Sequence, residues 1–258
     1  MKPVALKLRS GSDLTAGDIA ALDGLLVNLR QLNARDDIVG DGDARGAVHV
    51  ILDGIACRYK VTSGGRRAIT AYLLPGDFCD LHVSVLGRMD HSIGALTSCL
   101  VADFPQALLD DLMQTRPRIA KALWWTTLVD EAILREWLVN VSARPSDRKL
   151  AHLLCELRLR LEVVGLATPR GMKLPITQEE LGDTLGISSV HVNRVFQQLK
   201  QDGLVVTHGR EILFPNLARL EKFGEFNPEY LHLKMEDPHL KMGDLFQSPY
   251  ATGSRQAV

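Results

Sequence analysis

The chain has 258 residues, of which 46% are hydrophobic and 24% charged, and its formal net charge is −1 at pH 7. This length allows two compact domains, and the balance is that of an ordinary globular protein. No window approaches the roughly 18 consecutive apolar residues of a transmembrane helix. The N-terminus carries Lys2, Lys7 and Arg9 and lacks the apolar core of a signal peptide, so we expect a cytoplasmic protein without a membrane partner.

The distribution of charge and the positions of the cysteines favour some classes of function over others. Residues 144–219 hold eleven Lys and Arg against eight Asp and Glu, and this excess weakly favours a nucleic-acid partner for that part. Cys57, Cys79, Cys99 and Cys155 lie far apart without a CxxC pair, which argues against a structural zinc site and a clustered iron–sulfur site. We therefore expect buried free thiols.

The first hundred residues change from a helical to a strand pattern. Residues 12–32 place apolar side chains at helical spacing, which predicts a short amphipathic helix. From residue 48 to residue 104 apolar residues alternate with polar ones, and turns at 53–54, 62–65 and 75–77 interrupt the alternation. Short strands at this spacing predict an antiparallel barrel or sandwich.

A long helix follows, beginning at Pro117 and unbroken until about Val141. It carries two apolar stripes, and two stripes need two partners. We expect one to be the barrel and the other a second copy of the chain; the alternative is a helix buried within one larger domain. On this basis, changing Val129 and Ile133 to Asp is expected to give monomers. The stripes are Trp125, Val129, Ala132 and Ile133, and Trp124, Leu128 and Leu138.

A further helix is expected from near Ser146, followed by a loop over residues 165–175. Thr177 and Glu180 then form a capping box that starts a short helix. Gly186 ends this helix, and Ser188 caps a second one. Two short helices joined by a glycine turn predict a helix-turn-helix unit.

The second helix of this unit has an apolar and a polar face. Its apolar residues recur at positions 192, 195, 196 and 199, so the opposite face is exposed. Arginine, asparagine and glutamine on that face can contact base edges in the major groove. A strand, a turn at His208–Arg210 and a return strand follow, which predicts a wing near the phosphate backbone. The predicted DNA-binding residues are Thr177, Gln178, Ser188, Ser189, Val190, His191, Asn193, Arg194, Gln197, His208 and Arg210.

The run from Ile176 to Phe214 resembles the DNA-binding end of the Crp/Fnr superfamily, and "YLLPGDF" at residues 72–78 is similar to its cyclic-nucleotide-binding-like barrel. The resemblance spans roughly residues 15 to 220. It implies an α+β fold with an N-terminal antiparallel jelly-roll barrel (1–116), a dimerisation helix (117–143), a winged helix-turn-helix (144–220) and a C-terminal tail (221–258). It further implies a homodimeric transcription regulator that reads an inverted repeat in double-stranded DNA, is gated by its barrel, and has RNA polymerase as a partner.

Carried over by residue, the family's base-reading positions are Ser189, Val190, Asn193 and Arg194. Arg194 matches the family's arginine. Val190 replaces a glutamate of the best-known members, and valine cannot accept a hydrogen bond from cytosine. The family's usual half-site is therefore not expected.

The sensor pocket departs further from the family. Cyclic-nucleotide binders have a glutamate shortly after the Gly-Asp-Phe turn and later an arginine-serine pair, whereas this chain has Leu81 and the pair His91-Ser92. Without the arginine a phosphate loses its bidentate partner, so we expect poor binding of cyclic AMP and assign no cofactor and no metal. His82 and His91 are either ligands, titrating groups or histidines satisfied within the fold. The effector-pocket candidates are Gly76, Asp77, Phe78, Cys79, Asp80, His82, His91 and Ser92.

Two other function classes stay open. Related barrels house metal enzymes, which need two or three histidines and a carboxylate together, but His49, His82 and His91 form no HxH pair, so we do not expect an enzyme. A regulatory module without DNA binding is disfavoured by the winged segment. A metal assay and a DNA-shift assay are the discriminating experiments.

Overall fold

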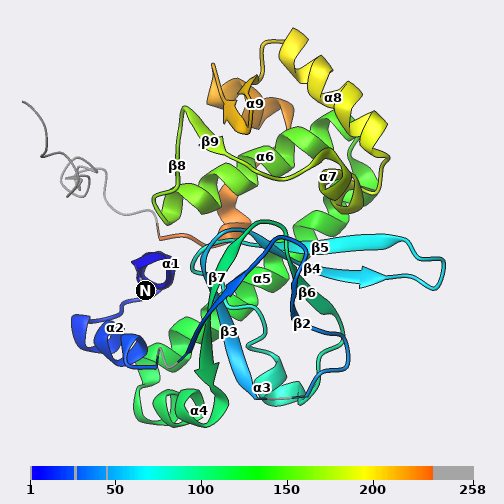
Figure 1. Ribbon diagram of the computed structural model, residues 1–258. Helices are drawn as coiled ribbons and strands as arrows, with labels where there is room; N and C mark the ends of the chain where they lie inside the picture. Colours follow the sequence, from blue (N-terminus) through cyan, green and yellow to red (C-terminus); the bar gives the residue numbers. More distant parts are fainter. Residues whose placement is uncertain (1, 26–27, 45, 235–258) are drawn as a thin grey trace, which may run out of the picture.

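The computed structural model describes residues 2–25, 28–44 and 46–234. A strand-rich N-terminal half and a helical C-terminal half lie against each other, and the long helix α5 passes alongside the strands (Figure 1). This is the predicted α+β fold: antiparallel barrel, long helix and helix-turn-helix, in that order.

The barrel consists of two antiparallel sheets, one with strand order β1-β7-β3 and the other with order β2-β6-β4-β5. The expected strands and the turns between them are confirmed. The turn at Gly54 requires glycine, because its φ is +84° and a Cβ would lie 2.2 Å from the backbone oxygen of Ser98. The strands are β1 (Asn28–Leu32), β2 (Asp37–Val39), β3 (Ala47–Asp53), β4 (Ala56–Val61), β5 (Arg67–Leu73), β6 (Ser92–Ala95) and β7 (Cys99–Pro105), with the short helix α3 (Val83–Leu86) before β6.

The predicted helix over residues 12–32 is wrong in extent. Helix α2 (Ala16–Asp23) begins at a capping box between Thr15 and Asp18, and β1 follows, paired along its length with β7. The sheet hydrogen bonds outweigh the helical spacing of the apolar side chains. An unpredicted helix, α1 (Lys2–Arg9), precedes α2 and buries Val4 and Leu8.

Helix α5 (Pro117–Ala143) follows α4 (Gln106–Thr115) and confirms the predicted long helix. Its two stripes have different surroundings: Val129 and Ile133 are buried in the chain's own core, whereas Trp124, Leu128 and Leu138 are exposed. The expectation that Asp at positions 129 and 133 separates two subunits is therefore wrong, because a charge there would be buried within one chain.

The C-terminal half is built around α6 (Ser146–Val163). The loop expected at 165–175 instead contributes a hairpin to a four-stranded sheet of order β10-β11-β9-β8. Helix α9 runs across residue 220, and a 3₁₀ turn beyond it buries Leu231; residues 235–258 of the expected tail lie outside the described residues. The remaining elements are β8 (Ala167–Thr168), β9 (Gly171–Lys173), α7 (Gln178–Leu185), α8 (Ser189–Gln201), β10 (Val206–His208), β11 (Glu211–Leu213), α9 (Leu217–Phe223) and η1 (Pro228–Leu231).

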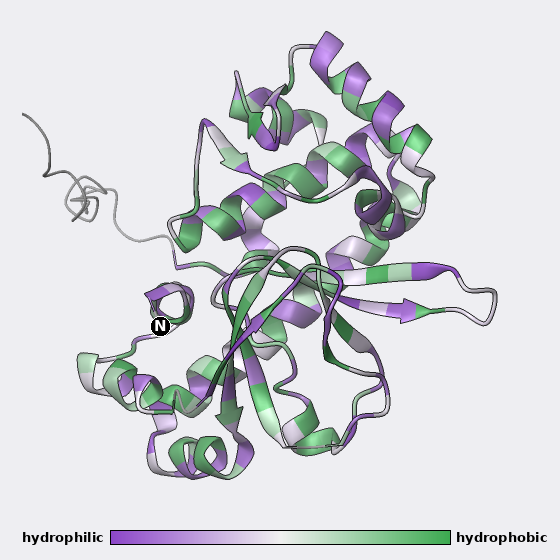
Figure 2. Ribbon diagram, in the orientation of Figure 1, coloured by the Kyte–Doolittle hydropathy of each residue, from purple (hydrophilic) through white to green (hydrophobic). Residues whose placement is uncertain are grey.

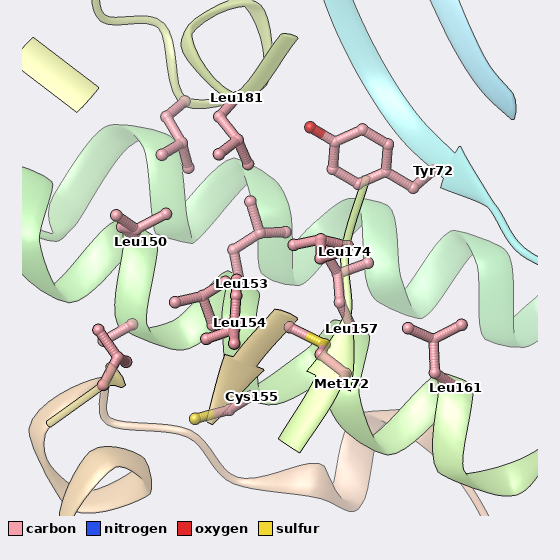
Figure 3. Close-up of a cluster of buried hydrophobic side chains, with 14 of the residues drawn as sticks. Tyr72, Leu150, Leu153, Leu154, Cys155, Leu157, Leu161, Met172, Leu174 and Leu181 are labelled. Carbon is pink, nitrogen blue, oxygen red and sulfur yellow. The ribbon is translucent and has the colours of Figure 1, made fainter. Parts of the chain in front are cut away.

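One hydrophobic core joins the two halves. It extends from β4 and β5 through α5 to α6 and α7. Figure 3 shows Tyr72 of β5 beside the leucines of α6, with Leu181 of α7 above them. The four cysteines are buried free thiols, as predicted, and burial raises the pKa of Cys57 to about 12.

Candidate functional site

Helices α7 and α8 are positioned by the caps that the sequence predicts. The hydroxyl of Thr177 accepts from the backbone N–H of Glu180, whose carboxylate accepts from the N–H of Thr177 at 2.7 Å. Gly186 adopts the left-handed conformation with φ of +70°. A Cβ on Gly182 would lie 2.6 Å from the backbone oxygen of Ile187, so the turn packs directly on α7. Ser188 caps α8 by accepting from the N–H of His191.

The apolar face of α8 is buried and its polar face is exposed. Val192, Val195 and Leu199 pack into the core. The opposite face is the polar outer surface of α8 in Figure 2. The predicted DNA-binding residues that are exposed on this face are Ser189, Val190, Asn193, Arg194 and Gln197.

Several predicted DNA-binding residues make contacts within the chain in addition to the caps. The Asn193 amide donates to the side-chain oxygen of Gln178 at 3.1 Å, which ties α8 to the start of α7. The half-buried His191 lies 2.8 Å from the hydroxyl of Ser146, at the start of α6. His191 therefore faces α6 and not the exposed face of α8.

The wing is the hairpin of β10 and β11. His208, Gly209 and Arg210 at its tip are exposed, and Gly209 has a φ of +60°. A groove of about 200 Å³ lies between the wing and α8, lined in part by Gln178, Gln197 and Arg210. The wing and the polar face of α8 thus border one surface.

A second cavity, of about 420 Å³, lies between the barrel and α5. Arg58 of β4 donates to the backbone oxygens of Phe78 and Cys79 and to Asp130 of α5, at 2.9 Å. We call this cavity the barrel pocket. Its lining includes Arg58, Tyr72, Phe78, His82, His91, Asp130 and Arg160.

Comparison with known proteins bears on both sites. A cyclic nucleotide-binding domain model matches residues 29–116, and a Crp-like helix-turn-helix domain model matches residues 148–223. The chain belongs to the Crp/Fnr family. It is a DNA-binding transcription regulator of that type.

Curated relatives and solved structures agree with this assignment. The chain is 29% identical to the transcriptional activator protein FnrL of Cereibacter sphaeroides, over 74% of this chain and 78% of FnrL. It is 25% identical to the transcriptional activator anr of Pseudomonas aeruginosa, over 82% and 85% of the two chains. FixK2 of Bradyrhizobium japonicum, a solved structure 25% identical, superposes with a TM-score of 0.69 over 76% of this chain and 96% of that one.

The eight pocket candidates of this Crp/Fnr regulator lie in different places. Phe78, His82 and His91 line the barrel pocket, together with residues that the sequence did not single out, such as Arg58 and Arg160. The other five candidates are not in its lining. Gly76 packs against α1, Asp77 faces α1 and α6, and Cys79 lies in the barrel core. The carboxylate of Asp80 accepts from the backbone N–H of His49, and the hydroxyl of Ser92 accepts from the N–H of Asp41.

The structure brings together two histidines and a carboxylate that are not paired in a sequence motif. His82, Asp90 and His91 each place one potential ligand atom within 4.8 Å of the others. An HxH pair on one strand was the expected signature, but these histidines come from the start of α3 and the loop before β6. The absence of an HxH pair in the sequence therefore does not keep two histidines and a carboxylate apart in the fold. Among the described helices of the regulator, none is long and apolar enough to span a membrane.

Proposed function

We propose that this regulator acts as a homodimer whose two α8 helices read an inverted repeat. The observation that carries the proposal is the uncovered apolar stripe along α5. Trp124, Leu128 and Leu138 are 68%, 51% and 65% exposed in the single chain. A row of large apolar side chains on one helix face marks an interaction surface. A two-fold axis along α5 gives each stripe an identical partner.

The base-reading residues of the proposal are those on the exposed face of α8. Arg194 can bind guanine bidentately, Asn193 can bind adenine, and Val190, 70% exposed, can contact a thymine methyl group. Asn193 must exchange its bond to Gln178 for the base. Thr177 and Gln178, at the start of α7, and His208 and Arg210, on the wing, would contact phosphates.

The regulator is proposed to act by binding DNA in the cytoplasm and recruiting RNA polymerase, and not by catalysis. The capped α7–α8 pair and its wing support this, because they have no role in a metal-dependent enzyme. A metal assay no longer separates the two classes, since His82, Asp90 and His91 could hold an ion in either. DNA selection does separate them.

Cyclic AMP is proposed not to be the effector. The guanidinium groups that line the barrel pocket already have carboxylate partners: Arg58 pairs with Asp130 at 2.9 Å and Arg160 with Asp77 at 2.9 Å. A cyclic phosphate would have to displace one of these pairs to obtain a bidentate partner. Calorimetric titration with cyclic AMP should give no affinity in the micromolar range.

The proposed function is tested by selecting binding sites for the full chain from random double-stranded DNA. We expect an inverted repeat whose half-site centres lie one helical turn apart, roughly 34 Å. Sedimentation of the purified complex should give two chains per DNA site. Selection of single half-sites, or of no sequence at all, would contradict the proposal.

A further inference from the structure

Two buried nitrogen atoms in the barrel pocket lack partners. The Nε2 atoms of His82 and His91 are both shielded from solvent, and neither has a hydrogen-bond partner among the described residues. The two imidazole rings stack, with centroids 5.3 Å apart and planes 28° from parallel. Buried polar atoms are nearly always hydrogen-bonded or bound to an ion, so two such atoms from one pair of rings call for a ligand.

Asp90 prepares His91 for metal binding. The Nδ1 atom of His91 lies 2.6 Å from a carboxylate oxygen of Asp90, so Nδ1 carries the proton and Nε2 keeps its lone pair. Metal-binding histidines in proteins usually donate their second nitrogen to a carboxylate in this manner. Lys60 donates to the backbone oxygen of Asp90 and thereby fixes the loop that carries both residues.

One cation in the pocket lining has its charge compensated within the chain. The guanidinium of Arg58 is paired with the carboxylate of Asp130 at 2.9 Å.

We propose that His82 and His91 bind one divalent transition-metal ion through nitrogen, with Asp90 as the carboxylate that orients His91 or adds an oxygen ligand. Imidazole nitrogen with carboxylate oxygen suits Zn²⁺, Co²⁺ and Ni²⁺ better than Mg²⁺ or Ca²⁺. A zinc–nitrogen bond of about 2.1 Å places two ligand atoms about 3.4 Å apart in a tetrahedral site. One potential ligand atom of each of the three residues already lies within 4.8 Å of the others. The pocket leaves room for water as a further ligand.

The test is calorimetric titration of the metal-free full chain with ZnCl₂ and CoCl₂, with no DNA present, so that its result does not depend on DNA binding. We expect one ion per chain. The Co²⁺ form should show visible absorption bands of a tetrahedral or five-coordinate site, which Zn²⁺ abolishes. This readout on the unaltered protein does not depend on whether any variant folds.

The variants His82→Gln and His91→Gln should each abolish the Co²⁺ bands, and Asp90→Asn should weaken binding about 10- to 100-fold. The matched control is His232→Asn, at an exposed histidine with φ of +48°, a conformation that asparagine tolerates. It should bind like the parent chain. Absence of stoichiometric binding in the unaltered chain, or binding that survives both glutamine variants, overturns the proposal.

Discussion

Single residues on the exposed face of α8 and on the wing differ in what they can contribute to DNA binding. Arg194 is exposed on the helix that enters the major groove in the proposed complex. Arg194→Ala should cost on the order of 1–3 kcal/mol of binding and relax specificity at one position of each half-site. The measurement is affinity for a set of single-base operator variants. An unchanged ranking of those variants would show that Arg194 does not read a base.

Arg210 at the tip of the wing is the matched comparison, because it is also an exposed arginine. As a phosphate contact it contributes equally to every sequence. Arg210→Ala should weaken all operator variants alike and reduce the slope of log K against log salt by about 0.9 for each phosphate that the variant no longer neutralises. Affinities at two or more salt concentrations give that slope. A loss of affinity confined to some variants would instead assign Arg210 to base reading.

The sequence predicts the residues of α8 much better than those of the barrel pocket. The α8 face follows from signals within a few residues of each other, namely the Ser188 cap and the apolar period of the helix. Asp77 follows a local turn signal too, but the direction of its carboxylate is set by Lys7 and Arg160, which are distant in sequence. A local pattern contains no information on such partners.

At the scale of one element, the proposed homodimer rests on α5. Leu128 and Leu138 are exposed in the single chain, so charged residues there cost little within one chain but are buried in a dimer. The double variant Leu128→Glu, Leu138→Glu should sediment as a monomer with an unchanged circular dichroism spectrum. Its affinity for an inverted repeat should fall toward that for a half-site.

The control for this variant is Leu108→Glu, which places the same charge on the exposed face of α4, where the leucine is 47% exposed. It should stay dimeric. If the parent chain is already monomeric at micromolar concentration, or if the double variant stays dimeric, α5 is not the dimer interface.

The sequence predicts a helix or strand correctly where the local pattern of residues and the tertiary contacts favour the same conformation. Helix α5 has a helical period, a proline at its start and no interruption, and its bounds agree with the prediction. Residues 28–32 have helical spacing but form β1, because β7 offers a continuous set of backbone hydrogen bonds to them. Such a partner, about 70 residues away, is not visible in a local window. The spacing of the apolar residues also predicts the two stripes of α5, but it does not show which of the two stripes faces the barrel.

In the whole molecule, one buried carboxylate joins three parts of the chain. Asp77 of the barrel pairs with Lys7 of α1 and, at 2.9 Å, with Arg160 of α6. Arg160 also donates to the backbone oxygen of Tyr72 at 2.8 Å and pairs with the buried Glu156. This cluster lies where the barrel meets the DNA-binding half, beside the core shown in Figure 3. The cluster is therefore a physical link between the barrel and the DNA-binding half.

Asp77→Asn keeps the shape of the side chain and removes its charge, which leaves Lys7 without this carboxylate partner and Arg160 with Glu156 alone. Removing one member of a buried ion pair costs about 3–5 kcal/mol, so the free energy of unfolding should fall by that order at pH 7. The control is Asp111→Asn, at an exposed residue of α4, which should change the free energy of unfolding little. Urea unfolding of both variants and of the parent chain at a series of pH values gives these free energies.

The pH dependence of this loss follows from the pKa of Asp77. Burial alone would raise that pKa, but Lys7 and Arg160 hold it below its usual range. A carboxylate whose pKa is lowered by folding contributes its stability above the unfolded pKa of about 3.9 and loses it as the pH falls through the folded pKa. The difference between the parent chain and Asp77→Asn should thus be constant above about pH 5 and shrink below about pH 4. A difference that stays constant down to the acid unfolding of both proteins would show that the charge of Asp77 does not hold the two halves together.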